Sequence, residues 1–261
     1  MTSGRLIRHR LAAGLAALAL GLSGLVGAAP AWAAGKRPVV VELFTSQGCS
    51  SCPPADALLG QLADRPDVLA LTLPITYWDM LGWKDTLASD ANTSRQKAYS
   101  DAMGHGGVYT PQMIVDGVTD VVGNREPQVM AAIAARQADA AAVPVSLTVT
   151  TGQIHVAVGA DDAVKPGKTR DATIWMFHVL GKATVAIKSG ENGGHSVTYR
   201  NVVRDVRAVG MWKGQPVSLD LPRGDFAHLP DDIVAVVVQQ DGYGRIVGAA
   251  AIQRPDYVAG R

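Results

Sequence analysis

The feature that most restricts the fold of this chain is a pair of cysteines, Cys49 and Cys52, between two segments of opposite character. Residues 37–44 form an apolar, β-branched run that gives way to Thr45-Ser46-Gln47-Gly48, which is typical of a buried strand entering a turn. Pro53-Pro54 come next, and proline is well tolerated in the first turn of a helix. The sequence therefore predicts that the cysteines lie where a strand passes into a helix.

A helix and further elements are predicted after the pair. Apolar residues recur at helical spacing on one face: Ala55, Leu58, Leu59 and Leu62. Residues 68–73 then read as a second strand, which gives a βαβ unit with parallel strands and a right-handed crossover. Helices are predicted at about 90–103 and 126–141, and Asp116-Gly117 predicts a two-residue hairpin turn between them.

The pattern changes after residue 142. Short apolar segments of alternating character follow one another without a convincing helix, which is typical of an antiparallel sandwich or barrel. Strands are predicted at residues 145–150, 153–158, 173–179, 183–188, 196–203, 216–221, 232–240 and 245–252. We therefore expect a first domain at 36–142 and a β-rich domain at 143–261.

Residues 1–33 are typical of a secretory signal peptide. Three arginines precede an apolar stretch over about 11–26, and Ala31-Trp32-Ala33 fits a cleavage site. The alternative is a membrane anchor, although the apolar stretch is short and glycine-rich. We expect a periplasmic or secreted protein with no stable membrane span after cleavage. Removal of the segment would change the net charge from +1 to −2, because it holds three arginines and no acid. A nearly neutral surface gives no reason to expect nucleic acid as a partner.

The spacing of the two cysteines suits redox chemistry. In an exported protein a lone pair is often a structural disulfide, but a four-residue loop would contribute roughly 2 kcal/mol at best. A metal site needs about four ligands, and the sequence has neither a second cysteine pair nor a close histidine pair. We predict no metal and no cofactor. Cys49 at the turn is the expected nucleophile, since the helix start favours a thiolate, and Cys52 is placed to resolve the mixed disulfide.

The turn resembles the active-site turn of the thioredoxin superfamily, and Thr110-Pro111 before a hairpin strand resembles its proline loop. That resemblance implies that the Thr110–Pro111 bond is cis. More narrowly, the chain is similar to secreted bacterial thioredoxin-like proteins catalogued as a domain of unknown function. The matching segments are residues 41–56, 77–79, 82–85, 95–96 with Tyr99, 109–112 and 197–204. The fold expected from the resemblance is α/β, with a thioredoxin-like domain followed by a mostly antiparallel, β-sandwich-like domain.

Three further site assignments follow. Glu42 interrupts the first strand and is a candidate buried acid that takes the proton of Cys52, or else an edge residue in solvent. Trp78, Thr110 and Pro111 are candidates for substrate binding beside Cys49, while Trp78 could also be a core aromatic. His105 could approach the sulfurs, although a surface position is the commoner outcome for a loop histidine.

The combined expectation is an exported thiol–disulfide oxidoreductase that acts on protein thiols or disulfides of the cell envelope. The alternative is a binding or assembly module of the envelope in which the Cys49–Cys52 disulfide is structural. The sequence leaves the direction of electron transfer and the oligomeric state open.

Overall fold

The computed structural model describes residues 1, 37–138, 143–150, 152–161, 171–223 and 233–253. The predicted signal peptide lies outside the described residues apart from Met1. Among the helices that are described, none is long and apolar enough to cross a membrane.

The element order confirms the predicted α/β class. The first half contains β1 (Val39–Thr45), α1 (Pro53–Leu62), β2 (Val68–Pro74), the short 3₁₀ helix η1 (Asp79–Leu81), α2 (Asp90–Ala102), β3 (Gln112–Val115), β4 (Thr119–Val122) and α3 (Glu126–Gln137). The second half contains β5 (Val145–Val149), β6 (Gln153–Val158), β7 (Ala172–Ala186), β8 (Ser196–Trp212), β9 (Val217–Pro222), β10 (Ile233–Gln240) and β11 (Ile246–Gln253).

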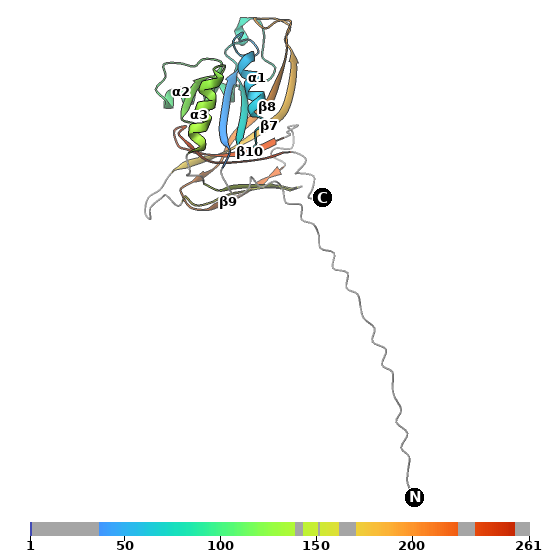
Figure 1. Ribbon diagram of the computed structural model, residues 1–261, viewed down its shortest axis with the longest axis vertical. Helices are drawn as coiled ribbons and strands as arrows, with labels where there is room; N and C mark the ends of the chain where they lie inside the picture. Colours follow the sequence, from blue (N-terminus) through green and yellow to red (C-terminus); the bar gives the residue numbers. More distant parts are fainter. Residues whose placement is uncertain (2–36, 139–142, 151, 162–170, 224–232, 254–261) are drawn as a thin grey trace.

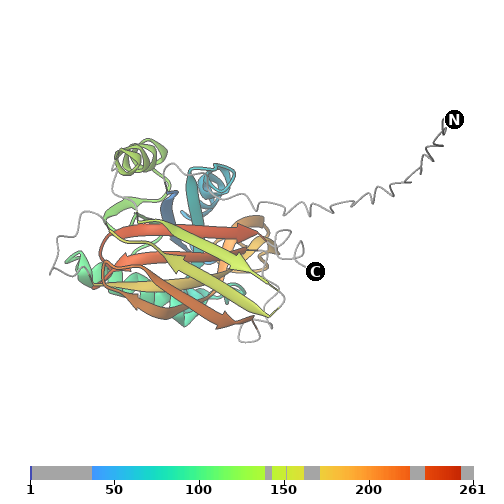
Figure 2. The ribbon, with the colours of Figure 1, turned by 90° about the horizontal axis from the view of Figure 1, so that it is seen from below.

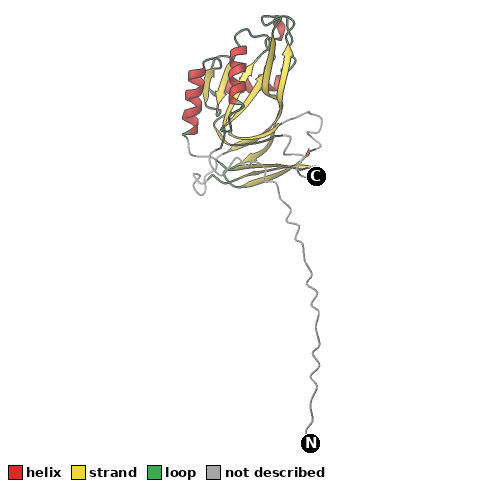
Figure 3. Cartoon of the chain, turned by 45° about the vertical axis from the view of Figure 1, so that its right-hand side comes forward, coloured by secondary structure: helices red, strands yellow, loops and turns green. Residues whose placement is uncertain are grey.

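A mixed eight-stranded sheet takes strands from both sides of residue 142, in the order β11-β10-β7-β8-β2-β1-β3-β4. β1 and β2 are parallel, as the predicted βαβ unit requires. β8 meets β2 in parallel, where the hydroxyl of Thr72 donates to the carbonyl of Arg200 over 2.7 Å. β5, β6 and β9 form a separate antiparallel sheet. Helices gather at one end of the molecule, and strands extend beyond them (Figures 1 and 3).

The alternation of β1 side chains divides the first half into two cores. Val41 and Leu43 pack with the apolar face of α1 and with α3, whereas Val40 and Phe44 pack with Tyr99 of α2. α1 and α3 accordingly lie on one side of the large sheet and α2 on the other (Figure 2). A third core fills the space between the small sheet and strands β7, β10 and β11.

The β7–β8 hairpin is much longer than the sequence indicates. The predicted separation between strands 173–179 and 183–188 is wrong, because β7 runs through Gly181 as one strand of 15 residues. β8 continues from the predicted 203 to Trp212, with 17 residues. Continuous pairing between the two strands, interrupted only by register shifts at Ile174/Trp175 and His178/Val179, sustains this length. The hairpin therefore carries its tip to the end of the molecule where α1 begins (Figure 1).

Candidate redox site

The cysteine turn connects β1 to α1 through short backbone hydrogen bonds. The N–H of Cys49 donates to the carbonyl of Ser46 over 3.2 Å, and the N–H of Cys52 donates to the carbonyl of Cys49 over 3.1 Å. Cys52 is the N-cap residue of α1, and prolines fill its first two positions. The two cysteines form a disulfide with their Cα atoms 5.4 Å apart.

Both cysteines are buried although the two serines between them are exposed. Cys49 is 1% exposed and Cys52 is not exposed. The hydroxyl oxygen of Ser51 lies 3.4 Å from the sulfur of Cys49. An incoming thiolate needs access to a sulfur, so exchange at this disulfide requires its covering residues to shift.

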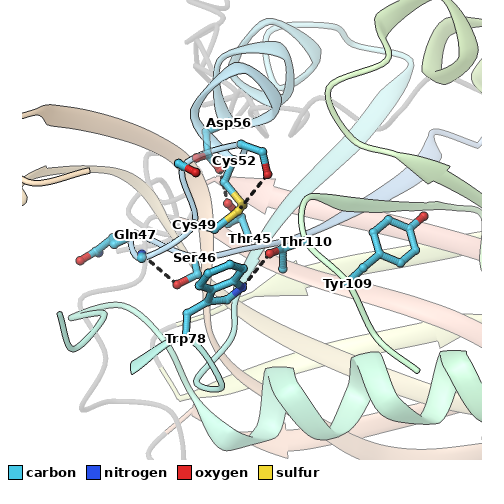
Figure 4. Close-up of a disulfide and its surroundings, with 12 residues drawn as sticks. Thr45, Ser46, Gln47, Cys49, Cys52, Asp56, Trp78, Tyr109 and Thr110 are labelled. Carbon is cyan, nitrogen blue, oxygen red and sulfur yellow. Dashed lines mark hydrogen bonds between the residues drawn. A yellow bond between two sulfur atoms is a disulfide. The ribbon is translucent and has the colours of Figure 1, made fainter. Parts of the chain in front are cut away.

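Trp78 covers the turn on one side and connects it to the proline loop. Its indole N–H donates to the hydroxyl oxygen of Thr110 over 2.8 Å (Figure 4). A Cβ on Gly48 would lie 3.2 Å from the Cβ of Trp78, so glycine is what allows this close approach. The Thr110–Pro111 bond is cis, which confirms the expectation from the resemblance. The structure therefore brings Trp78, Thr110 and the cysteine turn together.

Asp56 is a buried carboxyl group one helical turn after Cys52. Residues four apart in a helix share a face, and the backbone N–H of Asp56 donates to the carbonyl of Cys52 over 3.1 Å; Figure 4 shows both residues at the start of α1. One carboxyl oxygen accepts the hydroxyl of Thr45 over 2.8 Å, and the other has no hydrogen-bond partner within the described part of the chain. Burial raises the pKa of Asp56 to about 8, although the bond from Thr45 opposes the shift. With a pKa of about 8, Asp56 holds its proton in most molecules at neutral pH, and its ionised minority is a stronger base than an ordinary carboxylate.

Glu42 is also buried, but it faces the opposite side of the sheet. It shares the α2 side of β1 with Val40 and Phe44, away from α1. Its oxygens accept hydrogen bonds from Arg95, at 2.6 and 3.1 Å, and from the hydroxyl of Tyr99 at 2.5 Å. The structure does not bring Glu42 to the disulfide, because strand alternation turns it toward this ion pair.

A loop from the distant β7–β8 hairpin closes over the turn. The side-chain amide of buried Asn192 donates to the carbonyls of Gln47 and Cys49, both over 2.9 Å. The carboxylate of Glu191 accepts the N–H of Ser50 over 3.0 Å. The hydroxyl and the N–H of Ser50 lower the pKa of Glu191, which is exposed and ionised. The second half of the chain thus supplies one wall of the site.

Asp85 holds the other end of the turn. It accepts the N–H groups of Gln47, Leu87 and Ala88 over 2.8, 2.8 and 3.1 Å. Burial raises the pKa of Asp85, while the three donated N–H bonds favour its ionised form. Trp83 adds a bond from its indole N–H to the side-chain oxygen of Gln47, over 2.8 Å.

His105 belongs to a separate cluster on the far side of the proline loop. Its imidazole lies 3.1 Å from the carboxylate of Asp120, which also accepts the hydroxyl of Tyr109 over 2.5 Å. The His105 side chain is 42% exposed. Across the described ranges, no group of three or more His, Cys, Asp or Glu side chains is arranged to hold a metal ion.

Residues 40–239 match a family model described as "Protein of unknown function (DUF1223)". The chain belongs to the DUF1223 family. The sequence resemblance to a family catalogued as a domain of unknown function agrees with this match.

Two solved structures are similar to this DUF1223 chain. AGR_C_4864 from Agrobacterium tumefaciens is 35% identical, with a TM-score of 0.73, and the match covers 84% of this chain and 96% of that one. HBP35 of Porphyromonas gingivalis is 14% identical, with a TM-score of 0.53, and the match covers 85% and 76% of the two chains, which is a likeness of fold alone. No curated protein matches the chain.

Sequence reasoning on this DUF1223 chain missed three site residues: Asp56, Glu191 and Asn192. Asp56 has a recognisable signal, since it follows Cys52 by four residues at the start of a predicted helix. Glu191 and Asn192 have none, because they read as part of an ordinary glycine-rich turn. Their contacts with the cysteine turn span 141 to 145 residues of sequence.

Proposed function

We propose that this protein is a thiol–disulfide oxidoreductase that acts on envelope or secreted proteins through Cys49 and Cys52. The observation that carries the proposal is the disulfide at the junction of β1 and α1, with Trp78 and the Thr110-Pro111 loop packed beside it. The pair joins residues only three apart, so it contributes little as a staple. A buried carboxyl next to Cys52 supplies what exchange requires in addition, a group that takes and returns a proton.

The exchange proceeds in two balanced steps. The Cys49 thiolate attacks one sulfur of a substrate disulfide, which breaks that bond, forms a Cys49–substrate disulfide and releases a substrate thiolate that takes a proton from water. The ionised form of Asp56, roughly a tenth of the molecules at pH 7 for a pKa of about 8, then takes the proton of the Cys52 thiol, and the Cys52 thiolate attacks the sulfur of Cys49. The mixed disulfide breaks, the Cys49–Cys52 bond forms, and the second substrate thiolate leaves and is protonated. The same steps in reverse oxidise a substrate dithiol.

Asp56 replaces Glu42 as the proton acceptor in this proposal. Both are buried, but Glu42 is fixed in an ion pair on the opposite face, whereas Asp56 has an oxygen without a hydrogen-bond partner among the described residues. Trp78 and Thr110 are proposed to orient the substrate segment.

The full burial of the disulfide favours a second candidate function. With both cysteines buried and Asn192 bonded across the turn, a binding or assembly module with a permanent disulfide is the rival. The two functions differ in whether Cys49 ever forms a bond to another protein.

Trapping of the mixed disulfide separates the two. The Cys52→Ser variant retains the nucleophile and lacks the resolving thiol, so it should accumulate covalent adducts with a model disulfide protein such as insulin. Non-reducing electrophoresis detects the adducts, and Cys49→Ser is the matched control that should form none. Absence of adducts with Cys52→Ser, in a variant shown to be folded by circular dichroism, would contradict exchange and favour the binding module.

A further inference from the structure

The start of α1 offers few N–H groups to a sulfur anion. A helix N-terminus stabilises a thiolate through N–H groups that have no other partner. Pro53 and Pro54 have no N–H to contribute. The N–H of Cys52 donates to the carbonyl of Cys49, and that of Ser50 donates to Glu191. The turn therefore supports a Cys49 thiolate less than its position suggests.

Four acidic groups lie at or near the turn, and each comes from a different segment of the chain. The β7–β8 loop contributes Glu191, and the segment after η1 contributes Asp85. α1 contributes Asp56, and β8 contributes Tyr199. Burial, and then the charges of Asp56 and Asp85, raise the pKa of Tyr199, so these groups interact with one another. A thiolate formed here meets repulsion from the ionised carboxylate of Glu191.

We propose that these acidic surroundings make the Cys49–Cys52 pair an electron donor, so that the reduced protein reduces disulfides in substrate proteins, with Glu191 as a positioning residue for this direction. The inference rests on the exchange activity proposed above. A thiolate with few stabilising contacts makes the reduced form of the protein less stable. The equilibrium therefore favours the Cys49–Cys52 disulfide, and the reduced protein gives its electrons to the substrate disulfide. A thiolate of higher basicity is also the stronger nucleophile.

The electron balance needs one further reactant. The Cys49–Cys52 dithiol loses two electrons and two protons, and the substrate disulfide gains them to become two thiols. A dithiol electron donor must then reduce the Cys49–Cys52 disulfide before the next cycle. In the assay described below, dithiothreitol supplies those electrons.

The direction is tested with the full chain in paired assays. With dithiothreitol as the electron source, the wild-type protein should accelerate the reduction of insulin disulfides, and the Cys49→Ser variant should not. Two rates are compared. The rate at which the disulfide form oxidises a reduced, unfolded protein should be at least tenfold lower than the rate at which the dithiol form reduces insulin. Faster oxidation of the unfolded substrate than reduction of insulin would overturn the proposal. Equal turnover by Cys49→Ser would instead overturn the exchange function itself.

The contribution of Glu191 is tested by removing its charge. Glu191→Gln keeps an acceptor for the Ser50 N–H, and we expect it to shift the equilibrium with glutathione toward the reduced protein by about threefold, with a matching fall in the Cys49 pKa. A threefold shift corresponds to about 14 mV for this two-electron couple. Glu126→Gln removes the same charge from the first turn of α3 and should leave the equilibrium unchanged.

Pro54→Ala provides an independent second variant. Pro54 is exposed, and alanine restores an N–H to the start of α1, so this variant should shift the glutathione equilibrium in the same direction as Glu191→Gln. The contrary result is that exchange with glutathione proceeds while neither variant shifts the equilibrium more than the Glu126→Gln control does. That result would overturn the proposal that the acidic surroundings of Cys49 make the pair an electron donor.

Discussion

Two buried carboxyl groups lie on opposite sides of the same sheet and have different environments. On the α2 side, Glu42 is bonded to Arg95 and Tyr99, and the Arg95 guanidinium lies 5.1 to 5.4 Å from the ring centroids of Tyr99, Trp175, Phe177 and Tyr243. On the α1 side, Asp56 accepts one hydrogen bond, from the hydroxyl of Thr45, and no cation pairs with it within the described part of the chain.

Burial alone does not make a carboxyl group a proton acceptor, since Glu42 and Asp56 are both buried and, among the described residues, only Asp56 lacks a cationic partner. A guanidinium at 2.6 Å neutralises Glu42 and ties β1 to α2 and, through Gln239, to β10. Asp56 has no such partner in the described ranges, so burial raises its pKa to about 8, close enough to neutral pH for the group to give and take a proton. One carboxyl therefore holds the two halves of the chain together, and the other is available for chemistry.

Loss of the cation beside Glu42 should lower the free energy of unfolding more than any change on the Asp56 side. Arg95→Met leaves a carboxylate buried without its cation, so we expect the free energy of unfolding to fall by about 3–5 kcal/mol at pH 7. The free energy of unfolding is measured by urea titration. Arg65→Met, which breaks a partly exposed pair with Asp67, is the matched control and should cost less than about 1 kcal/mol. A loss for Arg95→Met no larger than that of the control would contradict the role given to the Glu42 ion pair.

The next effect is on the Asp56 side and depends on pH. The folded-state pKa of about 8 lies above the ordinary 3.8, so the native state binds the proton more tightly, and its stability falls as pH rises from about 4 to about 8. Asp56→Asn removes this term. The free energy of unfolding of Asp56→Asn, minus that of wild type, should therefore rise by about 3 kcal/mol between pH 5 and pH 7.5.

Unfolding by urea at several pH values checks this result. Asp64→Asn, at an exposed carboxylate after α1, is the control and should follow the wild-type curve. Parallel pH curves for wild type and Asp56→Asn would show that Asp56 has an ordinary pKa in the folded protein, and a carboxylate of ordinary pKa is too weak a base to take the proton of Cys52.

A smaller change is expected when Asp56 loses its hydrogen bond from the hydroxyl of Thr45. Thr45→Val keeps the shape of the side chain and deletes its hydroxyl. In the wild-type protein, the hydrogen bond from this hydroxyl lowers the pKa of Asp56. The pKa of Asp56 should therefore rise further, by up to about one unit. Carboxyl-carbon NMR measures this titration directly, and a fall in the pKa would be the opposite of the expected result.

The local parts of this site could be predicted from the sequence because their signals are local. The strand before Cys49, the helix after Pro53 and the hairpin at Asp116-Gly117 each depend on a few adjacent residues, and the structure confirms the strand, the helix and the hairpin. The predicted two-residue turn is wrong, because Val115 pairs with Thr119 and the loop therefore also includes Val118. The side of the sheet that Glu42 faces follows from its alternation with Val41 and Leu43, but only once α1 is known to cover those two residues.

The remaining parts could not be predicted, because they depend on pairing between distant segments. Gly181 and Lys182 read as a turn, and only their pairing with β8 reveals a continuous strand. The same pairing decides that Asn192 reaches the carbonyl of Cys49. Without the register of β7 and β8, no property of residues 189–194 distinguishes them from any other glycine-rich turn.

The Asn192 contact also sets an order of events during synthesis of the chain. The ribosome releases Cys49 and Cys52 well over a hundred residues before Asn192, since the contact spans 143 positions. Until that loop arrives, the nascent chain presents two uncovered sulfurs to any oxidant or thiol around it. Contacts of such long range are among the slowest to form in folding. The cysteine pair is therefore open to its surroundings in the newborn chain and can be enclosed only after Asn192, about three quarters of the way along the chain, has been made.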